Sequence, residues 1–158
     1  LVTKEKLVMN RAEQHVSMLY EMMPEHPGYK LLKEHGRAFT KIAHSLDGAG
    51  PQGECYKTSW IEQSKDLVYT EGVGCIEGLI PLDHAWLVIA GTQNCVDPTW
   101  NSPSDYFGVS FTYDFMSEWA ERVRFPSVFQ NLYMLRMSPE KVYDYLVQGL
   151  KTNGIPRT

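Results

Sequence analysis

The chain has no run of basic residues and no long hydrophobic run, and these two absences exclude two broad classes of partner. Its 15 Lys and Arg against 19 Asp and Glu give a net charge of −4. A mildly acidic protein without a basic patch has no electrostatic footprint for a phosphate backbone. The most apolar stretch, 85–90, is far shorter than the ~20 residues that a bilayer-spanning helix needs. We therefore expect no nucleic-acid partner and no membrane partner.

Cysteine is also scarce, since the chain contains only Cys55, Cys75 and Cys95. None of them forms a C-x-x-C pair, and an odd number is a poor disulfide framework. The first residues lack the apolar segment of a signal peptide. A reducing compartment fits best, so a cytoplasmic location is predicted. Cys75 and Cys95 are interpreted as small buried hydrophobic residues.

The length of 158 residues, with 43% hydrophobic and 22% charged residues, is typical of one globular domain. Apolar residues recur at helical spacing in four segments, and a fifth helix is expected to begin at the Glu54–Ile61 segment. The four segments are residues 3–23, 31–43, 114–122 and 138 to about 153. Residues 1–50 are thus predicted to be a helical N-terminal part, and 113–158 to hold C-terminal helices.

The middle part, 51–112, changes to the period of strands. Strands are predicted at 66–73, 84–89, 94–97 and 106–112, with a turn over 90–93. Helices at both ends and strands between them define an α+β fold with an antiparallel sheet flanked by helices.

One segment has the pattern of a nucleophile. The loop 47–53 is dense in Gly and Pro and runs directly into Cys55. A thiol at a helix N-terminus is stabilised as thiolate by unpaired N–H groups, so a lowered thiol pKa is expected. The backbone N–H groups of Cys55 and Tyr56 would then face a developing oxyanion.

Two further residues complete a catalytic triad in this interpretation. A two-residue turn at 90–91 places His84 directly opposite Asp97 on an antiparallel pair, and a four-residue turn is also compatible with the pairing. Asp97 would accept the proton of one ring nitrogen and leave the other free to take the proton of Cys55.

These residues also carry a resemblance. Gly53-Glu54-Cys55-Tyr56, His84-Ala85-Trp86 and Asp97-Pro98-Thr99-Trp100 resemble the transglutaminase-like branch of the papain-like superfamily, and also small phage and bacterial proteins. The resemblance implies a papain-like or transglutaminase-like core, the triad just described, no cofactor and, for a phage protein, the cytoplasm of its host. By analogy with papain-like enzymes, Gln52 is a candidate oxyanion residue.

Other interpretations of these residues stay open. Cys, His and Asp together also suit zinc, but the close local ligand spacings of a zinc site are missing, so no metal is predicted. Tyr69 and Glu71 share one face of a strand and either line a substrate cleft or, for Glu71, cap a neighbouring turn. Trp86 and Trp100 are interpreted as core residues.

The sequence therefore predicts a thiol-dependent hydrolase or acyltransferase. Its substrate would be a peptide, a protein or a small molecule with an amide, isopeptide or ester bond. The alternative is a phage-encoded binding or interaction protein that keeps the fold without catalysis. No oligomeric state is predicted.

Overall fold

The computed structural model describes residues 9–152. Its helices are α1 (Arg11–Met22), α2 (Pro27–His35), α3 (Cys55–Glu62), α4 (Tyr113–Val123), the 3-10 helix η2 (Phe129–Leu135) and α5 (Pro139–Gln148). Its strands are β1 (Arg37–Lys41), β2 (Leu67–Ile76), β3 (Leu82–Ile89), β4 (Asn94–Val96) and β5 (Ser104–Ser110). The predicted combination of helices at both ends with a central sheet is confirmed.

The five strands form one closed sheet in the order β1-β4-β3-β2-β5, and β5 pairs back with β1. The pairs β2–β3, β2–β5, β3–β4 and β1–β5 are antiparallel, as predicted. The pair β1–β4 is parallel, so the prediction of an antiparallel sheet is wrong at this one junction. The sheet closes there because β1 lies between β4 and β5.

Strand β1 lies where the sequence predicted the second half of a helix over 31–43. The helix ends at His35, and Gly36 is already extended; a Cβ atom at Gly36 would lie 2.3 Å from the carbonyl oxygen of Leu32, so this position requires glycine. The chain then extends, and Phe39 is buried inside the closed sheet. The spacing of apolar residues in this segment fits both a helix and a strand, and pairing with neighbouring strands selects the strand.

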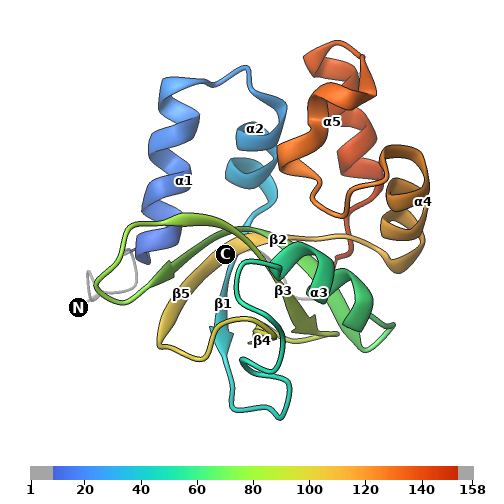
Figure 1. Ribbon diagram of the computed structural model, residues 1–158. Helices are drawn as coiled ribbons and strands as arrows, with labels where there is room; N and C mark the ends of the chain where they lie inside the picture. The colour runs from blue at the N-terminus through green and yellow to red at the C-terminus, as the bar shows by residue number, and fades with distance from the viewer. Residues whose placement is uncertain (1–8, 153–158) are drawn as a thin grey trace.

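The two faces of the sheet have different neighbours. The inner face holds a cluster of Phe39, Trp86, Val88, Cys95 and Tyr106. The outer face packs against the helices, and Figure 1 shows α1, α2, α4 and α5 grouped on one side while α3 lies alone beside β3. Because side chains alternate along a strand, neighbouring residues of β3 serve opposite faces.

Several predicted helix ends differ from the structure. The described part of the first helix is α1, and the predicted start at residues 3–8 lies outside the described residues. Helix α5 begins at Ser138 as its N-cap, as predicted, but Gly149 ends it before the expected 153, which is outside the described range. The sequence did not predict η2. None of the helices within residues 9–152 has the length and apolar character to cross a membrane.

Candidate catalytic site

The centre of the site is the carboxylate of Asp97, which is fully buried at the end of β4. Its Oδ2 lies 2.7 Å from Nε2 of His84 and accepts a hydrogen bond of 2.7 Å from the hydroxyl of Tyr106. Its Oδ1 accepts from the backbone N–H groups of Thr99 and Trp100 and from the Thr99 hydroxyl. Burial alone would raise the pKa of Asp97, but the hydrogen bond and charge of His84 and the other donors hold it below its ordinary value.

The His84 ring is held in one orientation. Because an ionised carboxylate only accepts, Nε2 carries the proton and Nδ1 is the nitrogen able to act as a base. The Trp100 ring stacks on the imidazole with centroids 3.5 Å apart and planes 9° apart. Gly74 of β2 makes room for this pair, since a Cβ atom there would lie 2.6 Å from the Trp100 ring. Trp100 is therefore more than the core residue that the sequence suggested.

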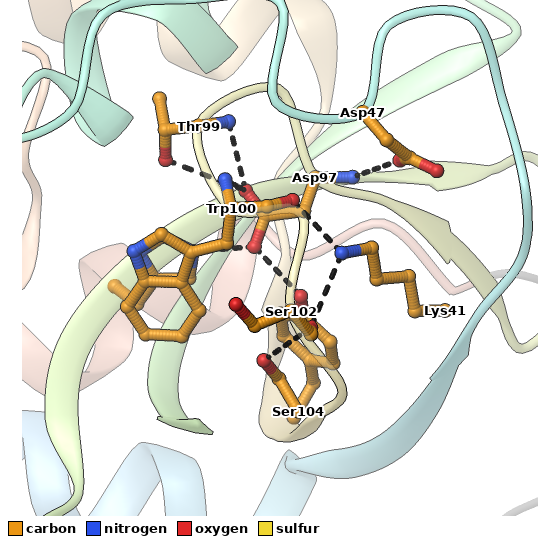
Figure 2. A network of polar contacts seen from close by, with 9 residues as sticks. Lys41, Asp47, Asp97, Thr99, Trp100, Ser102 and Ser104 are labelled. Atoms are coloured by element: carbon orange, nitrogen blue, oxygen red, sulfur yellow. Dashed lines mark hydrogen bonds and ion pairs between the residues drawn. The ribbon is translucent and has the colours of Figure 1, made fainter. Parts of the chain in front are cut away.

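Two residues that sequence reasoning missed fix the segment after Asp97. Lys41 of β1 donates from Nζ to the carbonyl oxygens of Trp100 and Ser102 at 2.8 and 3.3 Å. Oδ1 of Asp47 accepts from the Asp97 backbone N–H at 3.1 Å. Figure 2 shows these groups arranged around Asp97. Neither residue lies in a recognisable motif, so only the fold reveals them.

The loop before α3 is attached to the same segment. The N–H of Gly48 donates to the Asp97 carbonyl at 2.9 Å, and the N–H of Gly50 donates to the Pro98 carbonyl at 2.7 Å. A Cβ atom on Gly50 would lie 2.7 Å from the methyl group of Thr58, so a larger residue would force that side chain to move. These contacts bring the start of α3 against β3, where Cys55 lies at the backbone of Ala85, the residue after His84.

Cys55 is the first residue of α3, as predicted, and is 9% exposed. The backbone N–H groups of Ala85 and Tyr56 face its sulfur. Burial nevertheless raises the pKa of the thiol to about 11, and the nearby carboxylates of Glu71 and Asp97 act in the same direction. The expectation of a lowered thiol pKa is therefore wrong, because desolvation outweighs the helix terminus. No hydrogen bond joins Cys55 to His84 within residues 9–152.

The predicted direct opposition of His84 and Asp97 is wrong, although their side chains meet. The turn holds four residues, 90–93, and pairs Leu87 with Val96. Asp97 is thereby shifted by two residues from the position opposite His84. A shift of two keeps a side chain on the same face, so a diagonal contact replaces the direct one.

Glu71, 1% exposed on β2, accepts four hydrogen bonds. They come from the Tyr69 hydroxyl, the Ser127 hydroxyl and the backbone N–H groups of Val128 and Phe129. Glu71 thus caps the start of η2, one of the two roles that the sequence left open. Burial raises its pKa to about 7, against the four donors that favour the carboxylate. Burial also raises the pKa of Tyr69.

The two remaining candidates differ. Tyr56 follows Cys55 on α3, and its buried hydroxyl lies near Ser127 and Glu71. Gln52 is exposed in the loop and makes no hydrogen bond to another described residue, so its assignment as an oxyanion residue stays a prediction. Within residues 9–152 no group of three His, Cys, Asp or Glu residues is placed to hold a metal ion. Cys75 and Cys95 are free and buried.

Comparison of the chain with protein-family models, curated proteins and solved structures gave no match. The resemblance to transglutaminase-like proteins therefore rests on the residues themselves.

Asp97→Asn is expected to lower the free energy of unfolding by about 3 kcal/mol or more, because an amide would present N–H groups to donors in a buried site. Urea denaturation at pH 7 measures this change. The control is Asp83→Asn, an exposed site on β3, which should change the free energy by about 0.5 kcal/mol or less. A loss at Asp97 no larger than the control's would show that its hydrogen bonds do not hold the site together.

Glu71 should make stability fall as pH rises. The ordinary pKa of a glutamate is 4.5, and the pKa of Glu71 in the folded protein is about 7. Between pH 4.5 and pH 7 the folded state therefore binds more protons than the unfolded state. The free energy of unfolding should then decrease by about 3 kcal/mol from pH 4.5 to pH 7 on account of this group. Glu71→Gln should remove that part of the pH dependence in urea titrations, whereas Glu77→Gln, an exposed change beyond the same strand, should not.

Proposed function

We propose that this protein is a thiol hydrolase, or acyltransferase, with Cys55 as nucleophile, His84 as general base and Asp97 as the residue that orients His84. The observation that carries the proposal is the fixed imidazole. Nε2 is committed to an ionised carboxylate and the ring is stacked on Trp100, while the next residue, Ala85, faces the cysteine that begins α3. Such an arrangement of base and orienting group is the recurring requirement of nucleophilic catalysis. A papain-like or transglutaminase-like core is proposed with it.

The first step joins the Cys55 sulfur to the carbonyl carbon of an amide, isopeptide or ester. Nδ1 of His84 takes the thiol proton as the S–C bond forms, and the same proton then goes to the leaving amine or alcohol. Asp97 stays ionised and stabilises the imidazolium that exists between these events. In the second step water, or an amine in a transferase, releases the acyl group.

The start of α3 offers donors for the oxyanion. Glu54 is the N-cap residue but makes no side-chain capping hydrogen bond. The first N–H groups of a helix have no acceptor within the helix, so those at Cys55 and Tyr56 are available to a negatively charged oxygen. Since the resting thiol is neutral, the proton transfer from Cys55 and its attack on the carbonyl carbon occur together. Both events therefore need the substrate to be bound.

One observation favours the second candidate, a binding protein without catalysis. Cys55, His84 and Asp97 are only 9%, 1% and 0% exposed, and the thiol pKa is raised. A structural triad would have these properties too. The distinction is whether Cys55 forms a covalent acyl adduct that depends on His84.

Incubation with p-nitrophenyl acetate at pH 7.5 should place one acetyl group on Cys55, seen by intact-protein mass spectrometry and peptide mapping. His84→Gln should slow this acylation by about 100-fold or more, because glutamine can still donate to Asp97 but cannot act as a base. Cys55→Ala should abolish the adduct. Cys75→Ala, which removes a buried thiol elsewhere, is the control and should react like the wild type. An adduct that is spread over lysines, or that is unaffected by His84→Gln, would favour the binding protein.

Alkylation of the resting protein should show the raised thiol pKa directly. The rate of iodoacetamide labelling at Cys55 should increase with pH toward a midpoint near 11 rather than the ~8.5 of free cysteine. Mass spectrometry of quenched samples gives this midpoint. A midpoint below 8.5 would show instead that a thiolate exists before substrate arrives.

A further inference from the structure

The pairing between β1 and β5 stops before either strand reaches its end. The last paired residues are Phe39 and Tyr106. Continuing the same register would place Lys41, the last residue of β1, opposite Ser104, the first residue of β5, but these two residues are not paired. The two strands run apart at this end of the sheet (Figure 1). The closed sheet therefore has an opening between the end of β1 and the start of β5.

A groove of about 630 Å³ occupies this opening. Its volume is within the roughly 300–1,000 Å³ of common ligand sites. Residues 38–43 form one wall and residues 101–105 the other, and Asn10 and Asp47 also line the groove. We call it the β1 groove. Neither Cys55 nor His84 lines it, so it is separate from the proposed triad.

The backbone of β1 directs hydrogen-bonding groups into the groove. Thr40 and Ile42 donate their N–H groups to carbonyls on the β4 side of the strand. Successive residues of a strand direct their N–H and C=O groups to opposite edges, so those of Lys41 point to the β5 side. Phe39 uses that side to pair with β5, but Lys41 has no partner on β5. The N–H of Ala43 also has no hydrogen-bond acceptor among residues 9–152.

The opposite wall of the groove offers groups of the same kind. The carbonyl of Pro103 accepts from the Glu77 N–H at 3.0 Å, on the β2 side of β5. By the same alternation, the N–H and C=O groups of Ser104 point toward β1. A row of unpaired backbone donors and acceptors at the side of a strand is a template for pairing with another extended chain. The groove therefore matches an extended main chain, which offers donors and acceptors in alternation.

The side chains of the groove indicate which extended chain fits. Ile42 and Pro103 give it apolar surface, and its charged residues are two acidic ones, Asp47 and Asp105, and one basic one, Lys41. The Lys41 ammonium is already bound to two carbonyl groups. Oδ1 of Asp105, in contrast, accepts no hydrogen bond from the described residues 9–152. Apolar and basic side chains are therefore the complement of this groove.

We propose that the β1 groove binds an extended peptide segment of a partner protein, with alternating apolar and basic side chains, as an added strand paired to Lys41 and Ala43. The main-chain hydrogen bonds supply affinity, and the alternate side chains supply selectivity. This interaction goes beyond the proposed function and does not depend on it.

Two blocked hexapeptides, acetyl-VKVKVK-amide and acetyl-VEVEVE-amide, test the proposal with the full chain. In ¹H–¹⁵N NMR titrations at low salt, the lysine peptide should bind at least about tenfold more tightly than the glutamate peptide. The largest shifts should fall on the amides of Lys41, Ala43 and Ser104. With saturating lysine peptide, the Lys41 and Ala43 amides should exchange with solvent at least about fivefold more slowly, because they become hydrogen-bonded.

A methylated peptide separates main-chain pairing from attraction of charge alone. The lysine peptide N-methylated at its four central residues keeps every charge but loses the central N–H donors. It should bind at least about tenfold more weakly than the unmethylated peptide, because several main-chain hydrogen bonds are lost. Equal affinity of the two peptides overturns the proposal.

A pair of variants tests the same contact from the side of the protein. Ala43→Pro removes the N–H of an exposed residue and should weaken binding at least about fivefold, whereas the matched control Ala43→Ser keeps the N–H and should stay within about twofold. If Ala43→Pro fails to fold, the methylated peptide still decides the question. Shifts centred on Cys55 and Tyr56, equal binding of the glutamate peptide, or no saturable binding at millimolar peptide also overturns the proposal. None of these outcomes bears on acylation of Cys55, which tests the proposed function separately.

Discussion

The arrangement of the site depends on one buried charge, the carboxylate of Asp97. It accepts hydrogen bonds from both sides of the site, with Oδ2 facing His84 and Tyr106 and Oδ1 holding the turn that carries Trp100. A buried carboxylate is costly unless donors surround it, so these contacts are required for folding. The same contacts fix the tautomer of His84 and place Trp100 against its ring. Folding and the orientation of the His84 ring are therefore one event.

The protein buries a second carboxylate, and its environment has the opposite effect. Glu71 accepts four hydrogen bonds, yet burial raises its pKa to about 7, while the pKa of Asp97 is lowered. The two pKa values shift in opposite directions because Asp97 faces a histidine that can be cationic, whereas Glu71 faces only neutral donors. Environments that push the pKa values of two carboxyl groups in opposite directions give the two groups different roles. Asp97 orients the His84 ring, and Glu71 fastens η2 to the sheet.

The sequence predicted the parts of the site that are local and missed those that are not. Cys55 at a helix start and the contact of His84 with Asp97 follow from short motifs and the period of strands. Lys41 contacts the site through β1, and nothing in its neighbourhood distinguishes a strand from the end of a helix until β4 and β5 are present to pair with it. The thiol pKa was predicted with the wrong sign because helix position is visible in a sequence, whereas desolvation depends on the packed structure.

Burial of the Cys55 thiol limits the chemistry that the proposed triad would permit. A neutral, desolvated thiol reacts slowly with oxidants and with general electrophiles, since the thiolate is the reactive form. In the proposed mechanism, attack needs a carbonyl placed where Nδ1 of His84 can take the proton of Cys55 during bond formation. A substrate would have to reach the start of α3 to satisfy that requirement. Under this proposal the site would gain selectivity from the same burial that lowers its intrinsic reactivity, and binding energy from the rest of the substrate would supply the difference.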